Sequence, residues 1–263
     1  MQGIVSERIR IAAAGDVHAS EAVRERVEDA FARLDDVDLV LLAGDLTTHG
    51  EPEQAMVIAD AARLVDCPVV AVLGNHDYHG GREREIARVL RDAGVIVLDR
   101  AVTVLEVREL ELGIVGTKGF VGGFPGSSIP DFGEGLLRDL YAETTEEMCA
   151  IERGLQEVAR ADVRIVLLHY APVVETLEGE PLGIHAMLGS ARLAIPIAEY
   201  QPDLVLHGHA HAGSFEGRIG ETPVYNVAVH VTGRDFYVFD LDVVPRRHPA
   251  IEVEAPEVRA PQT

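Results

Sequence analysis

The sequence predicts an α/β protein with a four-layer α/β/β/α sandwich, in which two mixed β-sheets pack face to face and helices lie outside. Two observations carry this prediction. Short runs of valine, isoleucine and leucine alternate with amphipathic stretches through the first half of the chain. A second set of apolar runs follows a glycine- and proline-rich segment, and the last of them are separated by glycine turns. The strands divide into two sets, which we expect to form two sheets packed between helices.

The first half of the chain reads as β-α-β-α-β. Apolar runs at 9–16, 37–45 and 67–75 predict strands, and amphipathic stretches at 20–34, 51–65 and 81–94 predict helices. Strands that alternate with helices in this way pair in parallel, and strands that are apolar throughout are covered on both faces. We therefore expect this half to form a buried parallel sheet.

The second half mixes both kinds of pairing. Residues 102–117 predict two strands joined by a tight turn, and residues 118–135 predict a long glycine- and proline-rich loop. The remaining pattern predicts a helix at 136–160, a strand at 163–170, a helix at 190–200, a strand at 202–208, and antiparallel strands within 213–231 and 235–243. We expect one domain over residues 1–245, followed by a charged, proline-containing tail over 246–263.

Composition narrows the classes of function. The 263 residues are 47% hydrophobic and 25% charged, and the formal net charge of −21 disfavours nucleic-acid partners over most of the surface. A small phosphate substrate stays compatible, because bound divalent cations would reverse the potential within one pocket. No apolar run is long enough to span a membrane and no signal peptide is visible, so we expect a cytoplasmic protein. Cys67 and Cys149 lie far apart, without metal or redox spacing, and are expected to be reduced, buried thiols.

Polar residues follow four of the predicted strands, and a fifth leads into the histidine-rich stretch LVLHGHAHAG at 204–213. These residues are Asp16, His18, Asp45, Asn75, His76, Asp77, His169, His207, His209 and His211. Each has a structural alternative: the aspartates as helix caps or turn residues, Asn75 in a left-handed turn, and His169 bonded to backbone. Ligands gather outside the carboxyl ends of strands in open α/β sheets. The occurrence of such polar residues at the ends of five strands therefore favours one shared site.

The residue types indicate a metal site. Carboxylate oxygens, an amide oxygen and several imidazoles suit manganese, iron, cobalt or zinc, and suit copper(I) or an iron–sulfur cluster poorly. A carboxylate can bridge two ions, and two ions about 3.5–4 Å apart are the usual arrangement for hydrolysing phosphate esters. We expect two divalent or mixed-valence ions as cofactors.

The order D-x-H (16–18), G-D (44–45), G-N-H-D (74–77), His169 and G-H-x-H (208–211) resembles the calcineurin-like metallophosphoesterase family, from Ile9 to about Asp240. The resemblance implies that one ion is held by Asp16, His18, Asp45 and His211, and the other by Asp45, Asn75, His169 and His209. It implies that His76 faces the reacting phosphate without binding metal, with Asp77 as a candidate to orient its ring. His207 is expected to play a supporting or structural role.

Within the family, the stretch 169–213 is most similar to small prokaryotic phosphoesterases. Protein serine/threonine phosphatases carry an arginine after their G-N-H-E motif, whereas Tyr78 follows GNHD here. Lys118, Arg192, His185 and His79 are candidates for substrate contact, with ordinary surface or loop roles as the alternative, and His49 is a candidate to support Asp45.

The resemblance points to a phosphoric ester hydrolase that acts on small phosphodiesters, such as cyclic nucleotides or aryl model diesters. A hydroxide held between the ions would attack phosphorus, and His76 would donate a proton or hydrogen bond. The alternatives are a phosphomonoesterase, a nucleotide pyrophosphohydrolase and a non-catalytic scaffold, a use of this fold found in a retromer subunit. The expected partner is a small phosphate ester, and the sequence carries no signal for the oligomeric state.

Overall fold

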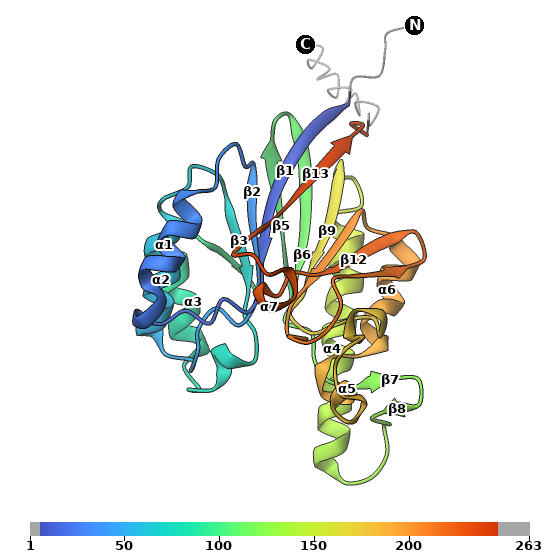
Figure 1. The fold of residues 1–263 in the computed structure, drawn as a ribbon. Coiled ribbons are helices and arrows are strands. Elements are labelled where there is room, and N and C mark those ends of the chain that lie inside the picture. Colours follow the sequence, from blue (N-terminus) through green and yellow to red (C-terminus); the bar gives the residue numbers. More distant parts are fainter. Residues whose placement is uncertain (1–5, 247–263) are drawn as a thin grey trace, which may run out of the picture.

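The computed structural model describes residues 6–246, in which two large β-sheets pack face to face and helices cover their outer faces (Figure 1). This arrangement confirms the predicted α/β/β/α sandwich. The predicted tail 246–263 lies outside the described residues except for Arg246, so the division into domain and tail stays a prediction.

The first sheet has the strand order β13-β1-β2-β3-β4. Its strands are β1 (Glu7–Ala14), β2 (Leu39–Ala43), β3 (Val69–Val72), β4 (Ile96–Leu98) and β13 (Tyr237–Val243). β1 to β4 pair in parallel, and β13 pairs with β1 in the antiparallel sense. The connecting helices are α1 (Arg24–Ala32), α2 (Pro52–Ala62) and α3 (Glu83–Asp92), which pack against the outer face of this sheet (Figure 1).

The second sheet has the strand order β11-β12-β10-β9-β6-β5. Its strands are β5 (Ala101–Val107), β6 (Leu110–Gly116), β9 (Val163–Leu167), β10 (Leu204–His207), β11 (Glu216–Ile219) and β12 (Thr222–Asn226). The helices α4 (Gly135–Glu157) and α6 (Ala194–Tyr200) cover its outer face. Shorter elements are the strands β7 (Gly123–Phe124) and β8 (Ser127–Ser128) and the helices α5 (His185–Leu188) and α7 (Val229–Thr232).

The interface between the two sheets is built from apolar side chains. β2 shows why, because all of its residues are buried and they alternate between two clusters. Leu39 and Leu41 point to the other sheet, whereas Val40 and Leu42 pack under the helices. Each such fully buried leucine stabilises the fold by about 2 kcal/mol. The continuous apolar runs of the sequence thus correspond to strands that are covered on both faces.

The structure differs from the sequence prediction at several elements, among them the short strands β7 and β8 within the predicted loop 118–135 and the helix α5. The three-residue strand β4 was not predicted, and the segment around residue 230, predicted as part of a strand, forms helix α7. The side chain of Asn226 accepts a hydrogen bond from the backbone N–H of Ala228 at 3.1 Å, which turns the chain out of β12. Gly233 then ends α7 in a left-handed conformation with φ of 62°.

Two smaller expectations concern the whole chain. Within residues 6–246, none of the helices combines the length and the apolar character that a membrane crossing needs. Cys67 and Cys149 are free thiols, as predicted, but both are partly exposed rather than fully buried.

Candidate metal centre

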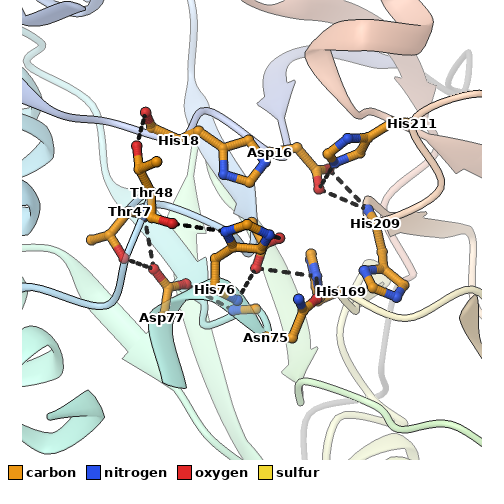
Figure 2. A network of polar contacts seen from close by, with 12 residues as sticks. Asp16, His18, Thr47, Thr48, Asn75, His76, Asp77, His169, His209 and His211 are labelled. Atoms are coloured by element: carbon orange, nitrogen blue, oxygen red, sulfur yellow. Dashed lines mark hydrogen bonds and ion pairs between the residues drawn. The ribbon is translucent and has the colours of Figure 1, made fainter. Parts of the chain in front are cut away.

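The predicted site residues meet at the carboxyl ends of strands from both sheets (Figure 2). The first sheet supplies Asp16 and His18 after β1, Asp45 after β2, and Asn75, His76 and Asp77 after β3. The second sheet supplies His169 after β9, and His209 and His211 after β10. The site therefore spans the junction between the two sheets.

Two groups of side chains bring electron-pair donors together. The first ligand group consists of Asp16, His18, Asp45 and His211, and the second ligand group consists of Asp45, His169 and His209. Within each group, each residue has a ligand atom that lies within 4.8 Å of the ligand atoms of the others. Asp45 belongs to both groups. The amide oxygen of Asn75 lies 2.9 Å from Nε2 of His169 and so adjoins the second ligand group. This is the geometry of a candidate dinuclear centre with one shared carboxylate.

Backbone carbonyl groups fix the histidine rings. His169 Nδ1 donates to the carbonyl oxygen of Ala43 at 2.9 Å, and His209 Nε2 donates to that of Met187 at 3.2 Å. A carbonyl oxygen only accepts, so the bonded nitrogen carries the proton and the other nitrogen of each neutral ring presents a lone pair. Such supporting contacts are typical of metal-binding histidines.

The surroundings of His169 test whether a cation fits. Its free Nε2 lies 2.9 Å from the amide oxygen of Asn75 and 3.3 Å from Oδ1 of Asp45. Three electron-pair donors that converge in this way repel one another, and a positive charge between them stabilises the arrangement. The mixture of carboxylate, amide and imidazole donors suits manganese, iron, cobalt or zinc. The residues present therefore fit a transition-metal ion, as the sequence implied.

The pKa values of several residues in the two ligand groups also favour cation binding. Burial raises the pKa of Asp16, but the hydrogen bond from His211, electrostatic interactions with His169 and His211 and the backbone hydrogen bond from His209 outweigh it and lower that pKa to about 2. Burial lowers the pKa of His209 to about 3, and burial also lowers the pKa of His18. The aspartate is thus ionised and these two imidazoles are neutral at pH 7, which are the forms that bind metal.

The backbone at the strand ends is strained. Asp16, His18, Asp45 and His209 all adopt left-handed conformations, with φ of 58°, 48°, 50° and 71°. Residues other than glycine rarely adopt these angles, and such strain concentrates at functional sites. Gly44, with φ of 83°, lies so close to His169 that a Cβ atom there would be 2.6 Å from Nδ1 of that ring. The tight turns bring the ligand groups together.

Asp77 takes a different part from the one expected. Its buried carboxylate accepts hydrogen bonds from the backbone N–H groups of Leu46, Thr47 and Gly74 and from the Thr47 hydroxyl. The ring of His76 is oriented instead by the carbonyl oxygen of Thr48, which accepts from Nδ1 at 2.8 Å. The expectation that Asp77 orients this ring is therefore wrong. Asp77 joins the loop after β2 to the loop after β3, and so helps to place Asp45 beside His76.

His207 is structural, as the sequence suggested. It is fully buried; Nδ1 donates to the carbonyl oxygen of Gly208 at 2.8 Å, and Nε2 lies 2.9 Å from the hydroxyl of Thr176. Burial lowers the pKa of His207 to about 4, so the ring is neutral at pH 7.

The other candidates are spread around the site. Lys118 has its ammonium group among three aromatic rings, 4.3 Å from the centroid of Phe120, 5.1 Å from Tyr170 and 5.6 Å from Tyr78. Tyr170 in turn lies against His209, with 4.4 Å between ring centroids. The expected solvated lysine is thus a partly buried group at the edge of the second ligand group.

Three further candidates are held elsewhere. Arg192 bonds to the carbonyl oxygen of Tyr141 and the hydroxyl of Thr145 on α4, and the ring of His185 contacts the carbonyl oxygen of Glu180. The backbone of His49 bonds to Gln54, and none of the described contacts of His49 reaches Asp45.

Some residues at the centre were missed by the sequence analysis. His230 on α7 stacks on His211, with ring centroids 4.4 Å apart and an angle of 14° between planes. It lies outside all five motifs and in a segment predicted as strand, so no sequence signal marked it. The carbonyl groups of Ala43, Thr48 and Met187 are backbone atoms, which sequence patterns do not identify.

Comparisons with known proteins agree with this geometry. The family model described as calcineurin-like phosphoesterase matches residues 9–213. Two ligand groups that share one carboxylate could hold a pair of metal ions, which is the arrangement that many phosphatases use. The chain belongs to the calcineurin-like phosphoesterase family, whose members are phosphoric ester hydrolases. The predicted family is thereby confirmed.

Individual relatives are distant. Purple acid phosphatase 4 of Arabidopsis thaliana is 28% identical over 148 residues, which are 55% of this chain and 41% of that protein. The chain thus spans about two fifths of the length of that relative. Phosphopantetheinyl hydrolase of Mycobacterium tuberculosis has a similar fold, with a TM-score of 0.65, 13% identity and coverage of 97% of this chain and 99% of that one. A protein of Thermus thermophilus follows with a TM-score of 0.56, 18% identity and coverage of 90% and 99%.

Proposed function

We propose that this protein is a dinuclear metal-dependent phosphohydrolase that acts on small phosphodiesters. The observation that carries the proposal is the shared carboxylate of Asp45, which belongs to both ligand groups. In this proposal Asp16, His18, Asp45 and His211 hold one ion, and Asp45, Asn75, His169 and His209 hold the other. When bound, such ions lower the pKa of water and neutralise charge on phosphoryl oxygens.

His76 is the proposed proton or hydrogen-bond donor to the phosphate ester. Its Nδ1 donates to the carbonyl oxygen of Thr48 at 2.8 Å, so Nε2 is the nitrogen that points to the centre, 3.9 Å from Oδ2 of Asp45. In the imidazolium form both ring nitrogens carry a hydrogen, and this is the form in which Nε2 donates. A donor at this place can supply a proton to the departing oxygen, which is a costly leaving group without one. His76 is in neither ligand group, so its removal should lower turnover more than metal content.

The charges around the centre favour a diester over a monoester. A diester carries one negative charge, whereas a monoester carries close to two at neutral pH. The formal net charge of the chain is −21. The side chains of Arg82, Arg100 and Arg192 bond to Glu85, Glu147 and Thr145, none of which is a proposed metal ligand. A monoanionic substrate therefore meets less repulsion at this centre.

The test compares two nitrophenyl substrates. Protein freed of metal by chelation is supplied with manganese and assayed on bis(4-nitrophenyl) phosphate and on 4-nitrophenyl phosphate. We expect faster manganese-dependent cleavage of the diester, loss of most of it in His76→Ala with metal content retained, and little change in His49→Ala as a matched control.

Other outcomes distinguish the alternatives. Faster cleavage of the monoester would indicate a phosphomonoesterase, and cleavage of a nucleoside diphosphate anhydride alone would indicate a pyrophosphohydrolase. Protein that takes up no metal from excess manganese, zinc, iron or cobalt would contradict the proposal and favour a non-catalytic scaffold.

A further inference from the structure

A row of imidazole rings runs along one side of the candidate metal centre. The ring centroids of His79 and His76 are 4.4 Å apart, and those of His76 and His18 are 4.5 Å apart. His18 lies 6.1 Å from His230, which stacks on His211 at 4.4 Å. The row thus has His79 at one end and His230 at the other, with the proposed proton donor His76 and the proposed ligand His18 between them; His211 lies beside His230, 5.4 Å from His18.

The ring of His230 has the features of a contact group. The residue is exposed, and neither ring nitrogen has a hydrogen-bond partner among the residues that the structure describes. One face of the ring stacks on His211, and the residue as a whole is exposed to solvent. Such a ring offers both a hydrogen-bond donor and a flat apolar surface to a bound molecule.

The position of His230 is fixed relative to the metal ligands. The backbone N–H of Val229 donates to the carbonyl oxygen of Gly15 at 3.0 Å, and that of Gly15 donates to the carbonyl oxygen of Val227 at 2.8 Å. These bonds join the start of α7 to the residue that precedes Asp16. His230 is therefore held against the strand end of the first ligand group, although it lies far from Asp16 in the sequence.

We propose that His230 forms the subsite for the ester group that a phosphodiester keeps after hydrolysis. This inference rests on the proposed function, in which His76 faces the leaving oxygen. Of the two ester groups, the one that leaves lies at the His76 and His79 end of the row, and the one that stays points to the other end, where His230 stands. A retained group with a flat ring, such as an aryl or nucleoside group, fits against the exposed His230.

Hydrolysis of a phosphodiester requires one place for the leaving group and another for the retained ester group. Water adds its oxygen to phosphorus, the bond from phosphorus to the leaving oxygen breaks, and a proton passes to that oxygen, so that the products are an alcohol or phenol and a phosphomonoester. The retained ester bond stays intact throughout. A monoester substrate has no retained group, and so the proposed subsite discriminates among diesters rather than acting on phosphate itself.

The test varies the retained group and keeps the leaving group constant. Methyl 4-nitrophenyl phosphate and phenyl 4-nitrophenyl phosphate both release 4-nitrophenolate. We expect the wild-type protein to prefer the phenyl diester in kcat/KM by about tenfold, which is the size of one aromatic contact or hydrogen bond. His230→Ala should reduce this preference to about one, and His230→Phe, which keeps the flat ring, should restore most of it.

His79→Ala is the matched control at the other end of the row. It should leave the ratio between the two diesters as in the wild type, because both substrates share the leaving group. A binding measurement without turnover gives a second readout. The affinity of manganese-loaded protein for phenyl phosphate, relative to inorganic phosphate, should fall in His230→Ala and not in His79→Ala.

The outcomes separate this inference from the proposed function. Wild-type protein that cleaves neither diester with manganese would contradict the proposed function. Wild-type protein that cleaves both, with the same phenyl preference in His230→Ala, would overturn the subsite alone. Metal content and melting temperature of each variant show whether α7 is still in place, and His230→Phe provides the comparison if the alanine variant is unstable.

Discussion

Nδ1 of His169, which follows strand β9 of the second sheet, lies 2.9 Å from the carbonyl oxygen of Ala43 in the first sheet. Ala43 is the last residue of β2, and Gly44 and Asp45 follow it directly. The strand end that carries the shared carboxylate therefore also orients a ligand from the opposite sheet. A change at this point should act on the metal centre more than on the fold.

Gly44→Ala tests this relationship. Gly44 has φ of 83°, and a Cβ atom would lie 2.6 Å from Nδ1 of His169, so the ring must move. We expect metal binding to weaken at least tenfold, since supporting contacts of metal ligands have effects of about 10–100-fold. Gly94→Ala is the matched control, because Gly94 has φ of 92° and open space around it. Both variants should lose about 1 kcal/mol of stability from backbone strain. Titration with manganese and urea unfolding measure the two effects, and equal metal affinities would contradict the prediction.

Asp45→Ala should remove both ions, whereas loss of an exposed carboxylate should remove neither. Asp45 is the only residue shared by the two ligand groups found among residues 6–246. We expect Asp45→Ala to abolish metal-dependent activity and to retain less than half an ion per chain, and His209→Ala to lose metal and activity as well. Asp66→Ala, on an exposed loop residue, is the control. Elemental analysis after gel filtration measures the number of metal ions bound per chain. Two retained ions in Asp45→Ala would disprove the assignment.

His207 should make the stability of the metal-free protein depend on pH. Burial lowers its pKa from 6.5 to about 4 in the folded state. Between these values the unfolded chain binds a proton that the folded chain excludes, so stability falls as pH decreases from about 6.5 to about 4. The contribution is on the order of 3 kcal/mol. Urea unfolding of chelated wild type and His207→Gln at pH 7.5 and 4.5 measures it. The wild type should lose more stability than the variant, and equal losses would refute the prediction.

Lys118 should stabilise the loops beside the second ligand group. It is the only lysine in the sequence, its ammonium group lies among Phe120, Tyr170 and Tyr78, and its carbonyl oxygen accepts from the backbone N–H groups of His169 and Tyr170. Lys118→Met keeps the length but removes the charge, and should cost about 1–2 kcal/mol for a partly desolvated cation–π contact.

The control for this prediction is an exposed contact of the same kind. Arg234 lies 5.9 Å from the ring centroid of Tyr237 on the surface, and Arg234→Met should cost less than about 0.5 kcal/mol. Thermal unfolding measures the loss of stability in each variant, and the two losses are then compared. A larger loss in Arg234→Met than in Lys118→Met would show that the aromatic surroundings of Lys118 contribute no stability.

Most of the fold was predictable because a strand that is buried on both faces appears in the sequence as a continuous run of apolar residues. β2 and β3 are apolar throughout, β1 is apolar over its last four residues, and each strand is followed by the polar residues of a motif. β4 was missed because Ile96–Leu98 is too short for a periodic pattern and lies against α3. The segment Val229–Thr232 is rich in β-branched residues, yet the Asn226 turn and the bonds to Gly15 make it helical. Tertiary contacts override local preference there.

The sequence predicted the side chains of the site, but not the groups that orient them. The family resemblance of the strand-end motifs implied two sets of ligands, and the structure brings residues of both sets together as candidate ligand groups. The partners that orient them are backbone carbonyl groups, as between His209 and Met187, and these leave no trace in residue identity. Asp77 was misjudged because adjacency in sequence to His76 suggested contact, while the turn directs its carboxylate to Thr47 instead. His230 comes close only through the return of the chain after β12.

The last strand of the described chain completes the sheet that the first strand begins. β13 pairs with β1 from Glu7 opposite Val243 to Ala13 opposite Tyr237. On the ribosome, β1 therefore emerges long before its outer neighbour, and its backbone groups stay open to other strands until Val243 has left the exit tunnel. Exposed strand edges of this kind promote intermolecular pairing. Chains whose synthesis stops before Tyr237 should accumulate as aggregates even though every proposed metal ligand has already been made.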